Sequence, residues 1–99
     1  MVRASVAFSV RLPKRSEALS AFDSLGDVMR RAPGCSAIRL LSDQEDVSAF
    51  EIVSEWSDAD DAEAFFASDD FRLFRGIRIL LASDPLIVLD DVRSRTRHR

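Results

Sequence analysis

Residues 50–71 read FEIVSEWSDADDAEAFFASDDF, and this stretch decides the fold. Apolar and polar side chains alternate from Phe50 to Trp56, which is the pattern of a strand with one face on a core. Trp56 is the only tryptophan of the chain, and it closes the strand. Ser57 and the acidic residues after it predict a helix start, and a second Ser-Asp-Asp-Phe start follows at Ser68. The stretch therefore predicts a strand followed by a helix in two pieces.

The chain before this stretch predicts a strand and an amphipathic helix. Large apolar residues alternate with small or polar ones from Ala4 to Leu12, and Pro13 ends the strand. Ser16 is the predicted N-cap of the helix that follows. Its apolar stripe recurs at steps of three and four residues and consists of Leu19, Phe22, Leu25, Met29 and Ala32. Pro33-Gly34 ends this helix.

Two more strands lie between this helix and Trp56. Residues 36–41 alternate as a second strand, and residues 48–56 form a third. The acidic run Asp43-Gln44-Glu45-Asp46 between them predicts a hairpin-like connection. We therefore expect these two strands to be antiparallel neighbours.

The end of the chain predicts one more helix segment and a last strand. The helix that begins at Ser68 buries Phe74, Ile77 and Leu81. Asp84-Pro85 ends it, and residues 86–92 read as a strand. The order βαββαβ predicts an α+β, ferredoxin-like fold with a four-stranded antiparallel sheet.

A sheet with helices on one face leaves its other face uncovered. The third strand places Phe50, Ile52 and Trp56 on one face and Val53 on the opposite one. Because a second sheet would bury the uncovered face, we expect a symmetric homodimer. The residues expected to be buried between the sheet, its helices and the second subunit are Phe8, Leu19, Phe22, Met29, Phe50, Ile52, Phe74, Ile77 and Val88.

This pattern resembles the antibiotic biosynthesis monooxygenase family. The residues that carry the resemblance are the strand-end Trp56, the two helix starts after it, and Ala32-Pro33-Gly34-Cys35 after the first helix. It extends over nearly the whole chain, and it implies one domain over residues 3–92, with residues 93–99 as a basic tail, and a dimeric α+β barrel. The family includes enzymes that oxidise electron-rich aromatic polyketides or quinols with molecular oxygen and no bound cofactor.

The resemblance implies a pocket for a small aromatic ligand between the sheet and the helices. The residues expected to line it are Trp56, Phe65, Phe66, Phe71, Phe74, Arg39 and Arg75. The aromatic side chains would form apolar walls, and the arginines would meet an anionic substrate oxygen if they turn inward. The same pattern also fits a plain aromatic core with solvated arginines outside it. No catalytic residue is singled out.

Two histidines that many members of the family carry are absent. Phe65 stands nine residues after Trp56 where one of them would be, and Asp70 stands at the other position. The only histidine is His98 in the tail, and the chain has no tyrosine or asparagine, so the haem chemistry of some relatives is not expected. The acidic clusters have no histidine or cysteine partner and the three glycines stand apart, so we predict no metal site and no cofactor.

Charge and apolar runs bear on partners and location. The tail contains four of the fourteen basic residues, which leaves ten basic against seventeen acidic residues in 1–92. An acidic body repels phosphate backbones, so nucleic acid is not an expected partner. No apolar run suits a membrane span and no signal peptide is recognised, which predicts a cytoplasmic protein. Cys35, the single cysteine, is expected to be a structural thiol.

Three functions remain compatible with these observations. The first is a cofactor-independent monooxygenase that acts on an aromatic or quinone-like molecule. The second is a non-catalytic dimeric module that binds a small ligand or serves as a stress or pathway accessory protein, which the missing histidines favour. The third is a purely structural dimer with a filled interior.

Overall fold

The chain forms a four-stranded sheet with helices against one face. The structure is a computed structural model, and it describes residues 1–75, 82 and 86–91. The elements in chain order are β1 (Val2–Ser9), the short 3-10 helix η1 (Leu12–Lys14), α1 (Arg15–Arg30), β2 (Cys35–Ser42), β3 (Ala49–Trp56), α2 (Ala59–Phe66), α3 (Asp69–Arg75) and β4 (Leu86–Asp91). This is the expected βαββαβ order, with the second helix split into α2 and α3.

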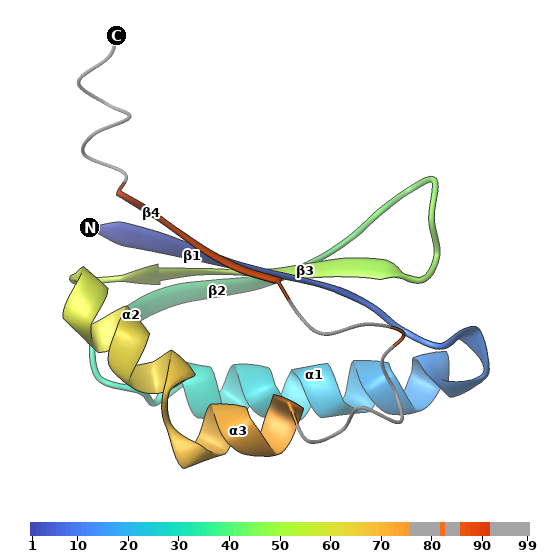
Figure 1. Cartoon of the computed structure of the whole chain (residues 1–99), viewed down its shortest axis with the longest axis horizontal. Coiled ribbons are helices and arrows are strands. Elements are labelled where there is room, and N and C mark those ends of the chain that lie inside the picture. The colour runs from blue at the N-terminus through green and yellow to red at the C-terminus, as the bar shows by residue number, and fades with distance from the viewer. Residues whose placement is uncertain (76–81, 83–85, 92–99) are drawn as a thin grey trace, which may run out of the picture.

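The sheet has the order β2-β3-β1-β4, and each neighbouring pair is antiparallel. Figure 1 shows α1, α2 and α3 together below the sheet, while none of the described helices lies on the upper face. We call this uncovered side the open face. The predicted α+β, ferredoxin-like fold is therefore confirmed.

Alternation along the two central strands decides which side chains enter the core. Along β1, the buried side chains are Val2, Ala4, Val6 and Phe8. Along β3, they are Phe50, Ile52, Ser54 and Trp56. The register sets Val6 opposite Ile52 and Phe8 opposite Phe50, so the two buried rows lie side by side under the helices.

Phenylalanine rings join the sheet to the helices. The ring of Phe22 on α1 lies 4.0 Å from that of Phe8 and 6.1 Å from that of Phe50, centroid to centroid. Phe74 on α3 lies 5.4 Å from Phe22 and 6.0 Å from Phe8. Contacts of this length are typical of aromatic pairs in cores, and they hold α1 and α3 against the same part of the sheet.

Most of the predicted core set is confirmed. The members that are buried are Phe8, Phe22, Met29, Phe50, Ile52 and Phe74. Leu19 is partly buried and packs against the core. Val88 is 50% exposed in the single chain, because its register opposite Ser5 turns it to the open face. Ile77 lies outside the described residues.

The boundaries of α1 differ from the predicted ones. Pro13 lies in η1, which runs directly into α1, so Ser16 lies inside the first turn of the helix and does not cap it. The predicted Ser16 cap is therefore wrong, and the residue at the N-cap position, Lys14, makes no capping bond with its side chain. The helix ends at Arg30, shortly before Pro33-Gly34.

The N-cap of α2 is shifted by one residue from the predicted one. The Asp58 carboxylate, and not the Ser57 hydroxyl, accepts a hydrogen bond from the backbone N–H of Asp61 at 2.8 Å. The predicted cap of α3 is present, since the backbone N–H of Phe71 donates to the Ser68 hydroxyl at 3.4 Å. Acidic side chains follow both caps, where the helix dipole favours negative charge.

A glycine turn ties the end of α1 to the start of α2. Gly34 has a φ of +84°, a conformation that L side chains rarely adopt. Its carbonyl accepts the backbone N–H of Ser57 at 2.8 Å, and the Asp61 side chain packs directly against its Cα. The turn needs glycine for both its conformation and its close approach to α2.

Several sequence predictions concern residues that the structure does not describe. They are the buried positions Ile77 and Leu81, the helix end at Asp84-Pro85, the last strand residue at 92, and the tail at 93–99.

The first prediction concerns the core. Replacing Phe22 by Ala should lower the free energy of unfolding by about 3–5 kcal/mol, because the ring is 2% exposed and its removal leaves a cavity. Leu12→Ala, at a position that is 57% exposed, is the control and should cost about 0.5 kcal/mol or less. Urea unfolding followed by circular dichroism measures both. A loss below about 1 kcal/mol for Phe22→Ala would contradict this assignment of the core.

The second prediction concerns the Gly34 turn. In Gly34→Ala, the positive φ alone should cost about 1–2 kcal/mol, and the added Cβ would lie 2.7 Å from the Cβ of Asp61, so the measured loss should be larger. Gly26→Ala is the matched control, because there the nearest atoms lie at 3.7 Å and the residue is helical. This control should leave stability unchanged or raise it by up to about 1 kcal/mol. Equal effects of the two substitutions would contradict the account of the turn.

Candidate functional site

Five of the predicted site residues form one aromatic cluster. Trp56 ends β3, Phe65 and Phe66 lie on α2, and Phe71 and Phe74 lie on α3. Centroid distances are 5.6 Å for Trp56 to Phe65, 6.1 Å for Phe65 to Phe71, and 5.7 Å for Phe71 to Phe74. Trp56 and Phe71 are fully buried, so these rings fill the space between the sheet and this pair of helices.

The indole of Trp56 is held by a short chain of hydrogen bonds. Its Nε1–H donates to the Ser54 hydroxyl at 2.8 Å, and that hydroxyl donates to the Ala4 carbonyl oxygen at 3.5 Å. Ser54 is itself buried. A buried indole N–H without a partner would be costly, so Ser54 fixes the orientation of the tryptophan within the aromatic cluster.

A groove of about 540 Å³ opens on the outer side of this cluster. It lies between the end of α1, the turn after it, α2 and the start of α3. Its lining residues are Val28, Arg31, Ala32, Pro33, Asp61, Ala64, Phe65, Ser68 and Asp70. We call it the helix groove. Phe65 is the one member of the aromatic cluster in this lining, so it joins the open groove to the buried rings.

Polar groups stand around the apolar floor of the helix groove. Arg31 donates its Nε–H to the Asp27 carbonyl oxygen at 3.2 Å, which holds its guanidinium along the end of α1. Asp61 and Asp70 stand on the facing helices, and the Ser68 hydroxyl is committed to the Phe65 carbonyl. One cation, two carboxylates and an apolar floor suit a flat apolar ligand with an anionic or carbonyl oxygen at one end and a hydroxyl at the other.

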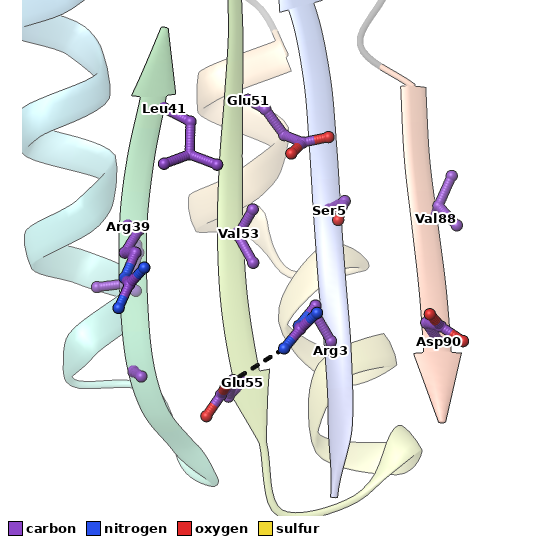
Figure 2. Close-up of a pocket in the computed structure, with 11 residues that line it drawn as sticks. Arg3, Ser5, Arg39, Leu41, Glu51, Val53, Glu55, Val88 and Asp90 are labelled. Atoms are coloured by element: carbon purple, nitrogen blue, oxygen red, sulfur yellow. Dashed lines mark ion pairs between the residues drawn. The ribbon is translucent and has the colours of Figure 1, made fainter. Parts of the chain in front are cut away.

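One of the two predicted arginines, Arg39, is not brought to this groove. Arg39 lies on β2 opposite Val53, and Figure 2 shows it on the open face together with Val53 and Glu51. The sheet therefore separates Arg39 from the aromatic cluster. Arg75 is the last residue of α3, and its side chain lies outside the description.

Sequence reasoning missed the residues that complete the site. Ser54 shares the face of Ile52 and Trp56, so the period of the strand alone could have identified it as a buried polar partner. Arg31 and Asp61 gave no such signal, because they come to line the same groove only when the Gly34 turn brings α1 and α2 together.

Cys35 is a poor candidate for a nucleophile. It is partly buried, opposite Trp56 in the sheet, and its thiol donates to the Ala37 carbonyl at 3.7 Å. Burial raises the pKa of the Cys35 thiol, and the Ala37 bond and the charge of Arg30 only partly offset this. The protonated thiol therefore dominates at neutral pH, and it is the thiolate that attacks electrophiles and binds metals.

The described residues do not suit haem or a metal ion. Residues 1–97 contain no histidine and the chain has no tyrosine, and the one cysteine is held as a thiol. Nowhere in the described ranges do three His, Cys, Asp or Glu side chains gather so that they could hold a metal ion. None of the described helices is long and apolar enough to cross a membrane.

Solved structures of other proteins share this fold. A crystal structure of an antibiotic biosynthesis monooxygenase has a TM-score of 0.81 and 26% identity, and it covers 93% of this chain and 98% of its own. The cofactor-independent oxygenase SnoaB from Streptomyces nogalater, solved as a mutant, has a TM-score of 0.79 and 22% identity, with 93% of this chain and 92% of its own covered. Rv0793 from Mycobacterium tuberculosis has a TM-score of 0.80 at 15% identity, covering 91% and 92%.

A curated relative matches part of this chain. A protein of Haloarcula marismortui whose name proposes haem binding is 31% identical over 64 residues, which are 65% of this chain. The match spans only 10% of the length of that relative. The family model described as antibiotic biosynthesis monooxygenase matches residues 1–76. On that match, which covers three of the four strands and all of the described helices, the chain belongs to the antibiotic biosynthesis monooxygenase family.

Proposed function

We propose that this chain is a cofactor-independent monooxygenase that binds a planar aromatic or quinone-like molecule in the helix groove. The observation that carries the proposal is the position of Phe65, which lines the groove and also packs on Trp56. Family membership supports the reaction class. The single cysteine, which has no partner for a disulfide within the chain, is compatible with a cytoplasmic setting, which we include in the proposal.

The proposed reaction needs electrons only from its substrate. When an anthrone-type CH₂ becomes a carbonyl, one oxygen atom of O₂ enters the product and the other leaves as water with the two hydrogens of the CH₂. The protein has to bind the substrate, keep water away and favour its deprotonated oxygen. The apolar floor would exclude water, and the Arg31 guanidinium would stabilise a phenolate or enolate oxygen.

A non-catalytic ligand-binding module is the alternative. The observation that favours it is that the described residues lining the helix groove include no histidine, tyrosine or cysteine, and their acidic and basic side chains are Asp61, Asp70 and Arg31. In this alternative the same groove binds the aromatic molecule but does not promote its reaction with oxygen.

We also propose that the protein is a homodimer that buries its open face. The apolar residues Leu41, Val53 and Val88 point to this face, and a hollow of about 540 Å³ lies among them. A second copy would cover these residues, as the sequence pattern suggests. Elution as a monomer of 11.1 kDa at micromolar concentration would contradict this part of the proposal.

The third prediction tests the reaction. Purified protein with no added metal, flavin or haem should increase oxygen consumption by members of a hydroquinone and anthrone panel, measured with an oxygen electrode. A chelator should not reduce the rate. Ligand binding without oxygen uptake would support the non-catalytic alternative. If no compound of the panel binds and none raises oxygen uptake, the proposed function is wrong.

The fourth prediction tests the groove. Phe65→Ala should weaken binding of the best panel compound by about 1–3 kcal/mol through lost aromatic contact. Arg31→Gln should weaken binding of the anionic form about tenfold, because a charge-assisted contact is lost. Isothermal titration calorimetry at two pH values measures both effects.

Neighbouring residues supply matched controls for these variants. Phe66→Ala removes a ring of the same cluster that does not line the groove, so it should lower stability with little change in affinity. Arg30→Gln removes a charge that does not line the groove. The Arg30 guanidinium instead pairs with the Asp27 carboxylate at 2.9 Å. If the controls weaken binding as much as the test variants do, the ligand does not bind in the helix groove.

A further inference from the structure

The open face carries both charged and apolar side chains. On β1 and β3 the charged residues are Arg3, Glu51 and Glu55. On the outer strands Leu41 of β2 is 43% exposed and Leu86 of β4 is 65% exposed. Figure 2 shows Arg3, Glu51 and Glu55 over the middle of the sheet, with Leu41, Arg39, Val88 and Asp90 on its two edge strands. Interfaces usually have an apolar centre and a polar rim, so the three charged residues on the inner strands are unusual for the centre of an interface.

Registers arrange the open face in three rows across the strands. Glu55, Arg3 and Asp90 lie level in the first row. Arg39, Val53, Ser5 and Val88 make up the second row. The third row consists of Leu41, Glu51, Ala7 and Leu86.

Arg3 lacks an acceptor for one of its donors. Its Nη2 lies 3.9 Å from Glu55 Oε1, and about a third of each side chain is exposed. Its Nε is buried and has no hydrogen-bond acceptor among the described residues. A long, half-exposed ion pair contributes little by itself, and a buried N–H without a partner is unfavourable. An acceptor from outside the chain would complete this site.

Only two simple two-fold arrangements stack this face on a second copy with the strands aligned. An axis across the strands reverses the rows, so Arg39 would face the partner's Arg39 and Glu55 would face the partner's Glu51. Both contacts bring like charges together, which is unfavourable. An axis along the strands keeps the rows and stacks β3 on the partner's β1 and β2 on the partner's β4. Glu55 then faces the partner's Arg3, and Leu41 faces the partner's Leu86.

We propose that two copies pack with the two-fold axis along the strands, so that Arg3 and Glu55 of both copies form a ring of four alternating charges. Each Arg3 bridges its own Glu55 and the partner's Glu55, which supplies the acceptor that its Nε lacks. This proposal rests on the homodimer stated under the proposed function and names the contact that sets its orientation. The relative twist of packed sheets, about 30°, displaces facing residues least near the axis, where these two inner strands lie.

The two parts of the interface have different physical roles in this arrangement. Leu41 and the partner's Leu86 remove apolar surface from water when they pack together, which favours association. The charged ring loses water on burial, so its attraction is largely cancelled by desolvation. Its effect is to select one orientation, because the axis across the strands would bring Glu55 to the partner's Glu51 and Arg39 to the partner's Arg39.

Charge reversal tests the ring directly. Arg3→Glu puts four carboxylates at the centre of its own dimer and Glu55→Arg puts four arginines there, so each variant should raise the dimer dissociation constant about tenfold or more. In a 1:1 mixture the two carboxylates of one copy face the two arginines of the other, and a heterodimer should form with a dissociation constant within about threefold of the wild type. Sedimentation equilibrium gives the constants, and native mass spectrometry identifies the heterodimer by its mass.

Arg39→Glu is the matched control, because it makes the same change of charge on the same face opposite an apolar residue. Mixing it with Glu55→Arg should not restore the dimer. A wild-type dimer without rescue in the Arg3→Glu and Glu55→Arg mixture would overturn the ring while leaving the homodimer in place. A tighter dimer for Glu55→Arg alone would point to the axis across the strands. A monomeric wild type would overturn both the ring and the homodimer. None of these outcomes depends on the ligand or on oxygen uptake.

A second set of variants covers the case in which a reversed protein does not fold. Arg3→Gln, Glu55→Gln and the double variant form a double-mutant cycle in the dimer dissociation constant. The product of the two single fold-changes in the dissociation constant should exceed the fold-change of the double variant by at least about threefold. Additive effects would overturn the ring.

Discussion

The pairing of β1 with β3 is the constraint on which the rest of the molecule depends. With Val6 opposite Ile52 and Phe8 opposite Phe50, one row of side chains is committed to the helices and the other to the open face. A slip of one residue would turn the other row of one strand inward and bring either Arg3 of β1 or Glu51 and Glu55 of β3 into the core. The aromatic contacts of Phe22 with both strands secure this register, because they require two phenylalanines side by side on the buried face. The core, the helix groove and the charged face all follow from this single choice.

Local patterns in the sequence predicted most of the fold, because strands of period two and helices of period 3.6 need only neighbouring residues to be recognised. The helix ends were less predictable. Ser57 and Asp58 are both good capping residues, and the choice between them depends on Ser57 being held by the Gly34 carbonyl, a contact between distant parts of the chain. Ser16 failed as a cap for a similar reason, since η1 leads into α1 without a break.

The candidate site was predicted in part. The five aromatic residues follow one another closely in sequence, so their gathering beyond Trp56 could be anticipated. Arg31 could not be, because its position in the helix groove depends on how α1 meets α2. The side of Arg39 was open to prediction from the alternation of β2, where its neighbours Ile38 and Leu40 belong to the other face. Local spacing thus identifies which residues share a surface, whereas a groove between elements needs the tertiary structure.

The dense packing of the aromatic cluster has a consequence for how new binding properties could arise in this chain. Trp56 and Phe71 are fully enclosed, and the rings of Phe65 and Phe66 lie 5.5 Å apart behind the wall of the groove. Apolar cavities made by shortening a buried side chain tend to stay dry and to accept small apolar guests. A single exchange of Phe71, whose ring lies 6.1 Å from that of Phe65, for a smaller residue would therefore open a cavity next to the groove without altering its polar rim. Through such substitutions, selection or design could convert the volume that these side chains now fill into a larger and more selective binding cavity.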